Sequence, residues 1–418
     1  MVFRTCGECQ IEMKILLVSH ILGGFAGDSG QMWHTANGLI NAGHEVDIFT
    51  TDGNPWFYDK AKKESYEKIR KKLLEANGKA VKIRNVNVYT VSCTSPKLGM
   101  YSRNTAKFAK ENIKKYDIVY AIHWYNHPVM TFAKIAHEKK VPFILAAYAS
   151  LMDPARSLNS RGKKILDFLY TKNMIKNTPG FHSVGELETN QYIKLGVKKE
   201  KIHHIDHGLV LEDFIIKNKS NIFEKININP KKDRYIIFVG RIDKKKGVDI
   251  LINSFVEIEK NFDDVSLVIV GTGLPSYEIE LKELVTKLNL KKVIFTGFVS
   301  EDEKLELLEA ATLFITISHS DVHTIAAQEA MAMGVPIILS KASDWPEIDE
   351  YNAGVTIDID VKSVEDAIKK MLDKNTNLSK YGENAKKLIE ERFLIESLIP
   401  KYEKMFETVI ERYDKNLS

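Results

Sequence analysis

Short apolar runs alternate with amphipathic stretches along most of the chain. Runs of this length predict β-strands, and in the first half they lie at 14–18, 44–49, 86–91, 118–122 and 143–147. Apolar positions with helical spacing predict helices at about 31–42, 59–76 and 132–140. Strands and helices that alternate in this way indicate a parallel sheet with helices on both faces.

The same alternation starts again after a polar stretch at 217–233, which is rich in Asn and Lys and is the best candidate for a linker. Strands are predicted at 235–239, 265–270, 292–296, 313–317 and 335–339, and helices at 247–260, 276–288, 301–310 and 324–333. The fold class predicted from this pattern is α/β, with two doubly wound, Rossmann-like domains built on parallel sheets.

The chain has 418 residues, which is too long for one ordinary core and suits two domains. We predict an N-terminal extension at 1–12, a first Rossmann-like domain at 13–210, a linker at 211–232 and a second Rossmann-like domain at 233–394. The last segment, 395–418, is expected to form a helix that packs back on the first domain.

A composition of 44% hydrophobic and 28% charged residues is typical of a globular protein. No apolar run approaches the ~20 residues that span a bilayer, and the polar first residues lack a signal-peptide core. Three cysteines are too few for a disulfide scaffold, and Cys6 and Cys9 form a single CxxC without a second pair to complete a zinc site. We therefore expect a cytoplasmic protein with no metal site.

Charge is distributed unevenly behind the net value of +4. Residues 13–210 hold 30 Lys and Arg against 17 Asp and Glu, which gives +13, whereas residues 211–418 hold 29 against 37, which gives −8; residues 1–12 add −1. A basic half favours contact with an anionic substrate or surface. Solvated faces in a generally Lys-rich proteome explain the charge equally well, so both explanations stay open.

Two cations follow the apolar run that ends at Val239, in the sequence Gly-Arg-Ile-Asp-Lys-Lys-Lys-Gly at 240–247. Parallel α/β sheets bind ligands at the carboxyl ends of their strands, and a helix N-terminus favours anions. Arg241 can give two parallel hydrogen bonds to a phosphate, and Lys246 adds a point charge at the start of the next helix. The spacing predicts a phosphate site, although strand-to-helix loops are often basic without a function.

Two carboxylates lie at the start of the helix predicted from Thr324. Asp321 precedes this helix, and Glu329 lies inside it in an otherwise apolar run. The backbone N–H groups of Thr324 and Ile325 are available to hold phosphate oxygens. A carboxylate in this position suits the hydroxyls of a ribose, whereas a solvated Glu would not explain its apolar neighbours. With the two cations, these residues predict a pocket for a nucleotide sugar.

In this order, the motifs resemble those of the retaining glycosyltransferases of family four, which have the GT-B fold. The second half carries Gly-Arg-x-x-x-x-Lys-Gly at 240–247, Val-Gly-Thr-Gly at 270–273 and Thr-Gly-Phe at 296–298. At 321–336, an acidic residue is separated by seven residues from Glu-Ala-Met-x-x-Gly-x-Pro. The first half carries a Gly-rich run at 23–30 and similar segments at 43–46, 152–164 and 184–188. The resemblance implies two domains that face each other across a cleft.

The resemblance also implies roles for individual residues. Arg241 and Lys246 would hold the donor diphosphate and stabilise it as a leaving group. Asp321 would bind hydroxyls of the donor sugar, and Glu329 would bind the ribose. Either Gly27 or Gly30 is expected to face the diphosphate, and Gly271 and Gly273 are expected in a loop near the nucleotide. The other expected contacts are Phe298 and Val299 at the base, and His323, Thr324 and Ile325 at the phosphates.

Several positions depart from the family pattern. Asp321 stands where Glu is usual, and His323-Thr324 stands where Phe-Gly is usual. Ala149, in Tyr-Ala-Ser at 148–150, stands where many members carry a His-Gly pair near the donor sugar. At the domain junction, His207 is a candidate for the cleft, with a hinge histidine of no function as the alternative. His123, at a predicted strand end, is the better candidate for acceptor contact.

The leading hypothesis is therefore a retaining, metal-independent transfer of a hexose from a nucleotide-diphosphate sugar, UDP- or GDP-linked, with no other cofactor. The acceptor is expected to be a saccharide, a lipid-linked or another anionic molecule, and the basic segment 60–84 is expected to contact the inner face of the membrane. A nucleotide-sugar epimerase or hydrolase of the same fold, or a non-catalytic nucleotide-sugar-binding protein, remains open. No nucleic-acid partner is expected, because no aromatic residues interleave with the positive charges.

Overall fold

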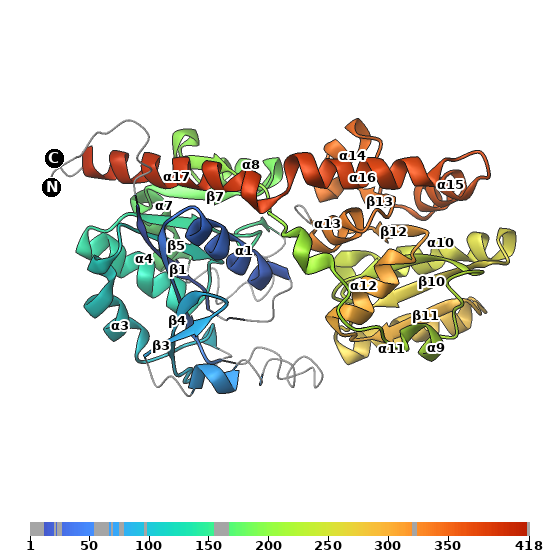
Figure 1. Ribbon diagram of the computed structural model, residues 1–418, viewed down its shortest axis with the longest axis horizontal. Helices are drawn as coiled ribbons and strands as arrows, with labels where there is room; N and C mark the ends of the chain where they lie inside the picture. Colours follow the sequence, from blue (N-terminus) through green and yellow to red (C-terminus); the bar gives the residue numbers. More distant parts are fainter. Residues whose placement is uncertain are drawn as a thin grey trace.

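The computed structural model describes residues 12–20, 22, 27–53, 67, 70–74, 79–95, 98–153, 167–319 and 324–415. Within these ranges, the strands form two sheets of eight and six strands, which lie in two separate α/β domains (Figure 1). The strand order is β3-β4-β2-β1-β5-β6-β7-β8 in the first sheet and β11-β10-β9-β12-β13-β14 in the second. The fold class predicted from the sequence is confirmed.

The first sheet is parallel except for its edge strand β3, which pairs antiparallel with β4 through a hairpin. Its strands are β1 (Lys14–Val18), β2 (Glu45–Thr51), β3 (Ala80–Ile83), β4 (Val86–Val91), β5 (Ile118–Ile122), β6 (Phe143–Ala146), β7 (Gly180–Ser183) and β8 (Ile202–His204). The hairpin turn consists of Arg84 and Asn85, both with positive φ, which is typical of a tight two-residue connection. The apolar periodicity did not predict this edge strand.

Helices cover both faces of the first sheet, as the alternation of side chains along β1 requires. Ile15 and Leu17 face one core, with α1 and α17, and Leu16 and Val18 face the other, with α3 and α4. The helices of this domain are α1 (Gly27–Asn41), α3 (Thr105–Asn112), α4 (His127–Lys139), α7 (Lys172–Asn177) and α8 (Glu186–Lys194), with shorter turns η2 (Ile113–Lys115), η3 (Asp167–Thr171), η4 (Lys199–Lys201) and η5 (Leu211–Phe214).

The second sheet is parallel throughout. Its strands are β9 (Arg234–Val239), β10 (Val265–Val270), β11 (Val293–Gly297), β12 (Leu313–Thr316), β13 (Ile337–Ser340) and β14 (Gly354–Ile357). The helices around it are α9 (Ile222–Lys225), α10 (Val248–Asn261), α11 (Pro275–Lys287), α12 (Glu301–Glu309), α13 (Ile325–Ala332), α14 (Glu347–Glu350), α15 (Val361–Leu372) and α16 (Leu378–Arg392), with short turns η6 (Lys244–Lys246) and η7 (Lys341–Ser343).

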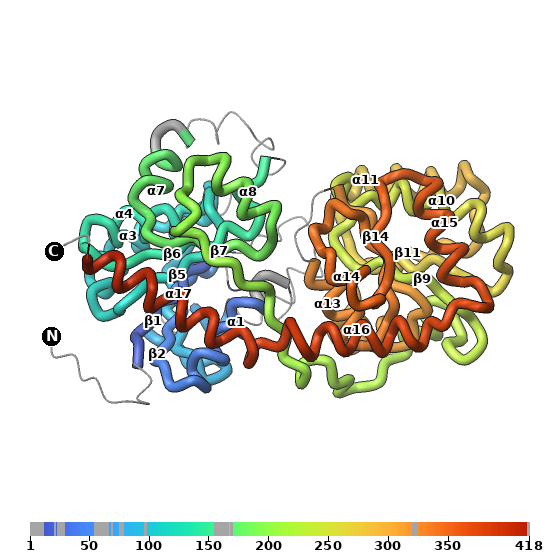
Figure 2. Tube along the Cα trace, turned by 90° about the horizontal axis from the view of Figure 1, so that it is seen from above, coloured from blue at the N-terminus to red at the C-terminus, as the bar shows by residue number. Residues whose placement is uncertain are grey.

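The last helix, α17 (Ile395–Lys415), returns from the second domain to the first. It follows α16 almost end to end, so that the two helices run along the length of the molecule (Figures 1 and 2). Tyr402, Phe406 and Val409 of α17 are buried against the face of the first sheet that α1 also covers. The C-terminal helix therefore completes the first hydrophobic core.

The chain crosses between the domains at two places, and these crossings are hydrogen-bonded to each other. The N–H of Leu209 donates to the carbonyl of Phe393 at 2.8 Å, and the N–H of Ile395 donates to the carbonyl of Leu209 at 2.9 Å. Before the second domain, the segment that was predicted to be a linker contains α9, and the N–H of Ser220 in this segment donates to Glu306 on α12 at 2.6 Å.

Candidate active site

Loops from three neighbouring strands meet at the carboxyl edge of the second sheet. The N–H of Gly240, after β9, donates to the carbonyl of Val270 at 3.0 Å, and the N–H of Ile242 donates to that of Thr272 at 3.0 Å. The next layer is joined in the same way, because the N–H of Gly271 donates to the carbonyl of Gly297 at 2.9 Å. The loop that holds Arg241 thus lies directly on the loop after β10.

Two glycines make this close approach possible. A Cβ atom on Gly271, whose φ is +130°, would lie 1.9 Å from the carbonyl oxygen of Gly240. A Cβ atom on Gly273 would lie 1.8 Å from the carbonyl oxygen of Ile242. Both distances are far below van der Waals contact, so only glycine fits. These glycines were predicted to lie near the nucleotide, and in the structure they support the loop of Arg241.

Arg241 is oriented by its own loop. Its Nε donates to Oδ2 of Asp243 at 2.7 Å, while 57% of the Arg241 side chain remains exposed. The other oxygen of Asp243 accepts the N–H of Lys245 at 2.9 Å and caps the short turn η6. The guanidinium group is therefore held at the strand end while much of it is accessible to a ligand.

The loop after β9 also touches the loop after β12, because these strands are neighbours in the sheet. The N–H of His319 donates to the carbonyl of Lys245 at 2.8 Å. Lys246, which was predicted at the start of a helix, is the last residue of η6, and α10 begins two residues later at Val248, after a left-handed Gly247. Lys246 is half-buried between these elements.

Helix α13 is the helix that follows β12, so its N-terminus lies at the same carboxyl edge of the sheet. Its N-cap is Thr324, whose carbonyl accepts the N–H groups of Ala327 and Gln328 at 3.0 and 3.2 Å. The N–H groups of Ile325 and Ala326, the first two residues of the helix, have no acceptor inside the helix and face its N-terminal side. Asp321 and His323, which were predicted to bind the donor, lie outside the described residues.

Glu329 lies in the second turn of α13 and forms a buried ion pair. Its Oε1 accepts a hydrogen bond from Nζ of Lys304 on α12 at 2.8 Å, and the two side chains are only 10% and 11% exposed. Lys304 also contacts Glu301, one turn earlier on α12, at 2.6 Å. Burial raises the pKa of Glu329, and the ammonium group of Lys304 acts in the opposite direction. The sequence analysis did not identify this lysine, although its spacing from Glu301 places both on one helix face.

The remaining predicted nucleotide contacts follow β11. Phe298 is 41% exposed, and Val299 packs partly against the core of the second domain. They come directly after Gly297, which has φ of +71° and lies beside Gly271. Their backbone is therefore close to the glycine loop at the same sheet edge.

In the first domain, four rings form a line at the carboxyl edge of the sheet, which we call the aromatic row: His20, His123, Tyr148 and His207. The centroids of successive rings are 5.4, 5.7 and 4.8 Å apart, and every pair is edge to face. The first three follow the neighbouring strands β1, β5 and β6. Burial, with a contribution from His123, lowers the pKa of His20 to about 3, so this imidazole is neutral at physiological pH.

The structure changes the interpretation of the turn after β6. The ring in the aromatic row belongs to Tyr148, whose hydroxyl lies 3.0 Å from that of Tyr120. Ala149, which was taken as the residue replacing a family histidine, has its N–H bonded to the buried carboxylate of Glu188 at 2.8 Å. Both turn residues have positive φ. A side chain capable of hydrogen bonding is therefore present here, one residue earlier than expected.

The junction between the domains is held from both sides. The carbonyl of His207 accepts a hydrogen bond from Nε2 of Gln328, next to Glu329, at 3.1 Å. From α1, Gln31 accepts the N–H of Gly208 at 2.9 Å, and His34 lies 3.0 Å from the Gly208 carbonyl. The sequence analysis missed these contacts. The only local signal is the three-residue spacing of Gln31 and His34, which places both on one face of α1 but does not show what that face contacts.

Two glycines of the first domain were predicted in a phosphate-facing loop. Gly27 and Gly30 are instead in the first turn of α1, which begins four residues earlier than the expected start at 31. The penalty for glycine in a helix, about 1 kcal/mol each, is outweighed by the burial of this helix against the sheet. The expectation of a loop was wrong for these two residues, whereas the expectation that one of them faces the diphosphate stays a prediction. The rest of the Gly-rich run, 23–26, lies outside the described residues.

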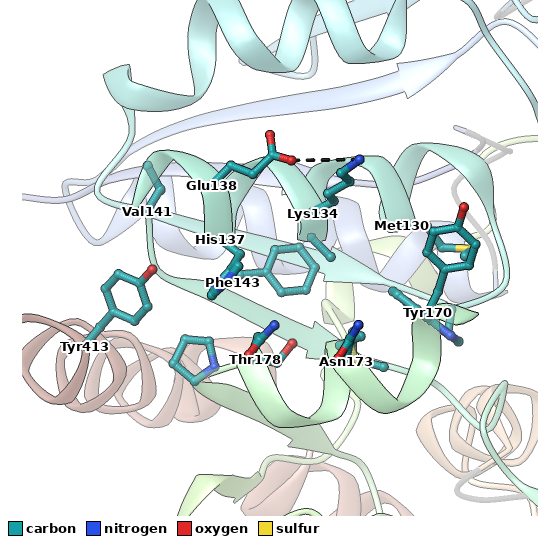
Figure 3. Close-up of a pocket in the computed structure, with 15 residues that line it drawn as sticks. Met130, Lys134, His137, Glu138, Val141, Phe143, Tyr170, Asn173, Thr178 and Tyr413 are labelled. Carbon is teal, nitrogen blue, oxygen red and sulfur yellow. Dashed lines mark ion pairs between the residues drawn. The ribbon is translucent and has the colours of Figure 1, made fainter. Parts of the chain in front are cut away.

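A groove of about 310 Å³ lies away from all these residues, between α4 and α7 (Figure 3). Its floor is mostly apolar, and Tyr170 and Tyr413 stand at its ends in Figure 3. It is lined by Trp124, Met130, Ala133, Lys134, His137, Glu138, Val141, Phe143, Tyr170, Asn173, Met174, Asn177, Thr178, Pro179 and Tyr413. None of the predicted site residues is among them.

Membrane contact was expected through the basic segment 60–84. The structure describes this segment only at 67, 70–74 and 79–84, where Arg70 Nε donates to the carbonyl of Asp52 at 2.7 Å. Among the helices that are described, none is both long and apolar enough to cross a membrane. The membrane contact stays a prediction.

Two family models match the chain. Residues 30–213 match the model described as Glycosyltransferase Family 4, and residues 218–388 match the one described as Glycosyl transferases group 1. A relative in Methanocaldococcus jannaschii, named as an uncharacterized glycosyltransferase, is 26% identical over 81% of this chain and 83% of its own length. The N-acetyl-alpha-D-glucosaminyl L-malate synthase of Bacillus anthracis is 28% identical over 44% of this chain and 48% of its own.

Solved structures agree on the fold. HepE of Anabaena, crystallised with UDP and glucose, superposes with a TM-score of 0.72 at 18% identity, over 95% of this chain and 100% of that one. Sucrose-phosphate synthase of Thermosynechococcus elongatus gives a TM-score of 0.71 at 16% identity, over 96% and 100%. With both halves matched by models of one family, the chain belongs to the group 1 glycosyltransferases of family four, which have the GT-B fold and use nucleotide-sugar donors.

Proposed function

We propose that this glycosyltransferase moves a hexose from a UDP- or GDP-linked donor to a hydroxyl group of a saccharide or lipid-linked acceptor, with retention of the anomeric configuration. The observation that supports the donor side is the meeting of three sets of groups at one sheet edge. These are Arg241 and Lys246 of the 240–247 loop, the N-terminus of α13 and the carboxylate of Glu329. Cations and helix N–H groups suit a diphosphate, and a carboxylate suits a ribose.

In this proposal, the diphosphate is the leaving group. Negative charge grows on its oxygen as the bond to the sugar breaks, and Arg241 and Lys246 stabilise it together with the first N–H groups of α13. Because these groups are held by the loop contacts before substrate binds, little reorganisation is needed. Glu329 accepts hydrogen bonds from the ribose, and Asp321 is proposed to bind the donor sugar.

Retention follows from the family resemblance. The acceptor hydroxyl attacks on the face from which the diphosphate leaves, and an oxygen of the departing phosphate takes its proton. The new glycosidic bond forms as the sugar–phosphate bond breaks, so no protein nucleophile is required. The enzyme contributes by positioning the two substrates and by excluding water when the domains close.

We place the acceptor at the aromatic row of the first domain. His123 and Tyr148 occupy its middle, and His207 joins the row to the segment that Gln328 holds from the donor side. Aromatic ring faces suit the C–H faces of a sugar, and the neutral imidazole of His20 suits its hydroxyls. The basic character of the first domain supports an acceptor with an anionic or lipid-linked part beyond the reacting sugar.

The test is a titration of the purified protein with UDP, GDP and ADP by calorimetry, with Arg241→Ala beside the wild type. We expect one diphosphate to bind preferentially, and Arg241→Ala to weaken it at least tenfold, because a charge-assisted hydrogen bond contributes roughly 1.5–3 kcal/mol. Thermal stability should change little, since Arg241 is largely exposed. Lys244→Ala is the matched control, because Lys244 lies in the same loop but is 75% exposed and pairs with Glu280.

Equal affinity of the wild type and Arg241→Ala for the preferred diphosphate would refute the phosphate assignment. Hydrolysis of the matching nucleotide sugar is followed in the same preparation. A transferase is expected to release the sugar slowly to water, whereas a protein that only binds nucleotide sugars would release none.

A further inference from the structure

A buried lysine lies beside the carboxylate that we assign to the ribose. Lys304 projects from α12 toward α13, and its Nζ is 2.8 Å from Oε1 of Glu329. Both side chains are nearly removed from water, at 11% and 10% exposure. Lysine is rarely buried to this extent, because the loss of hydration costs several kcal/mol per ion unless partners compensate.

The cost is compensated by two carboxylates. Glu301 lies 2.6 Å from the same ammonium group and is itself 55% exposed, so Lys304 stands between a buried and a half-exposed carboxylate. Burial disfavours the charge on Lys304, but Glu329 and Glu301 together raise the pKa of its ammonium group above the usual range. Lys304 is therefore a permanent cation next to Glu329.

The contact uses only one oxygen of the carboxylate. Lys304 donates to Oε1, and within the described ranges no protein hydrogen bond to Oε2 of Glu329 is present. An ion pair that served packing alone would leave this acceptor without use in a largely dry position. The arrangement leaves Oε2 for a hydroxyl group at the N-terminal half of α13.

We propose that Lys304 is a positioning residue of the donor site, which keeps Glu329 ionised and fixes its carboxylate so that it can accept hydrogen bonds from the ribose. This inference rests on the proposed role of Glu329. Lys304 itself does not touch the substrate in this arrangement. Without it, burial of Glu329 favours the protonated carboxyl group, in which one acceptor oxygen becomes a donor hydroxyl.

The surroundings of Glu329 give the proposal a pH signature. The charged and titratable groups that face it are Lys304 and Glu301 on α12 and His34 on α1. Burial raises the pKa of Glu329, Lys304 and His34 lower it, and Glu301 raises it. Ribose binding that needs the carboxylate is present above this pKa and is lost as the pH falls through it. Removal of Lys304 must therefore move this loss to higher pH, and removal of Glu301 must move it to lower pH.

The experiment measures the affinity for UDP and for 2′-deoxy-UDP between pH 5.5 and 8.5, or for the GDP pair if GDP binds more tightly. The variants are Lys304→Met, Lys304→Arg, Glu301→Gln and Glu329→Gln. Glu329→Gln supplies the background pH dependence of the diphosphate itself. Lys225→Met is the matched control, since Lys225 is 55% exposed and pairs with another carboxylate of α12, Glu303, at 2.8 Å.

For Lys304→Met, we expect the UDP affinity at neutral pH to fall about tenfold and to recover partly as the pH rises. The preference for UDP over its 2′-deoxy form should fall as well. Lys304→Arg should keep most of the UDP affinity and most of the preference for UDP. Lys225→Met should leave both quantities at their wild-type values. Glu301→Gln, at a half-exposed position, should fold normally and shift the acidic loss of UDP binding to lower pH.

Two failures are distinguishable. If Glu329→Gln loses the preference for UDP while Lys304→Met and Glu301→Gln keep the wild-type pH profile, the role of Lys304 is refuted and the ribose assignment stands. If Glu329→Gln keeps the wild-type affinity and preference, the ribose assignment is wrong and the inference falls with it. If Lys304→Met does not fold, the test rests on Glu301→Gln. A pH dependence of UDP affinity equal to that of the wild type in Glu301→Gln would contradict the proposal.

Discussion

Replacement of Gly271 by alanine tests the loop contact on which the donor site depends. The new Cβ would lie 1.9 Å from the carbonyl oxygen of Gly240, and Cβ atoms essentially never approach closer than 3.0 Å, so the loops must separate by about 1.1 Å. The φ of +130° adds backbone strain for any residue other than glycine. Strain of about 1–3 kcal/mol and overpacking of about 1–3 kcal/mol together predict a loss of roughly 3 kcal/mol or more in the free energy of unfolding.

The displacement reaches the ligand site through one residue, because Gly240 precedes Arg241. A shift near 1 Å at a positioned group can reduce turnover by about 100-fold. Scanning calorimetry would measure the loss of stability, and titration with the preferred nucleoside diphosphate would measure the loss of affinity. The control is Gly196→Ala, which has a φ of +91° but no atom within 4 Å of the new Cβ, and should cost about 1 kcal/mol without affecting binding. If Gly271→Ala matched this control in both assays, the steric argument would be refuted.

Two further predictions concern the first domain. Glu188→Ala should lower the free energy of unfolding by about 3 kcal/mol in urea titrations, because the buried carboxylate accepts hydrogen bonds from the N–H groups of Ala149 at 2.8 Å and Val184 at 3.1 Å. A variant as stable as the wild type would contradict this. His204 is paired with the buried Asp206 at 3.2 Å, which raises the pKa of His204 above 6.5. The stabilisation by this pair is complete below pH 6.5 and is lost as the pH rises through the raised pKa. In urea titrations, the free energy of unfolding of the wild type should therefore exceed that of His204→Gln by up to about 1 kcal/mol at pH 5.5 and by little at pH 8.5.

The sequence predicts the second domain closely because its signals are local. The apolar run at 265–270 is β10 itself, and the strands and helices on either side differ from the prediction by one or two residues at their ends. Parallel strands place their carboxyl ends at one edge, so the motifs after β9 and β12 were expected to share a site. That these two strands are neighbours, with His319 bonded to the loop of Arg241, is a property of the sheet order.

Contacts between distant segments escaped the prediction for a physical reason. Lys304 is one of many lysines on amphipathic helices, and only the packing of α12 on α13 turns it into a buried partner of Glu329. The aromatic row likewise joins residues that follow β1, β5 and β6 with one at the domain junction, and long stretches of chain separate them. Periodicity reports which face of an element is buried, but it does not say against which other element.

The path of α17 has a consequence for how this protein is made. The strands of the first domain are synthesised early, but Tyr402, Phe406 and Val409, which close one face of that sheet, are synthesised only after the whole second domain. Until then, the face of β1, β2 and β5 that α17 covers is incomplete. We therefore expect the second domain, built from a continuous stretch, to mature before the first, so that translation reverses the order in which the two halves reach their native state.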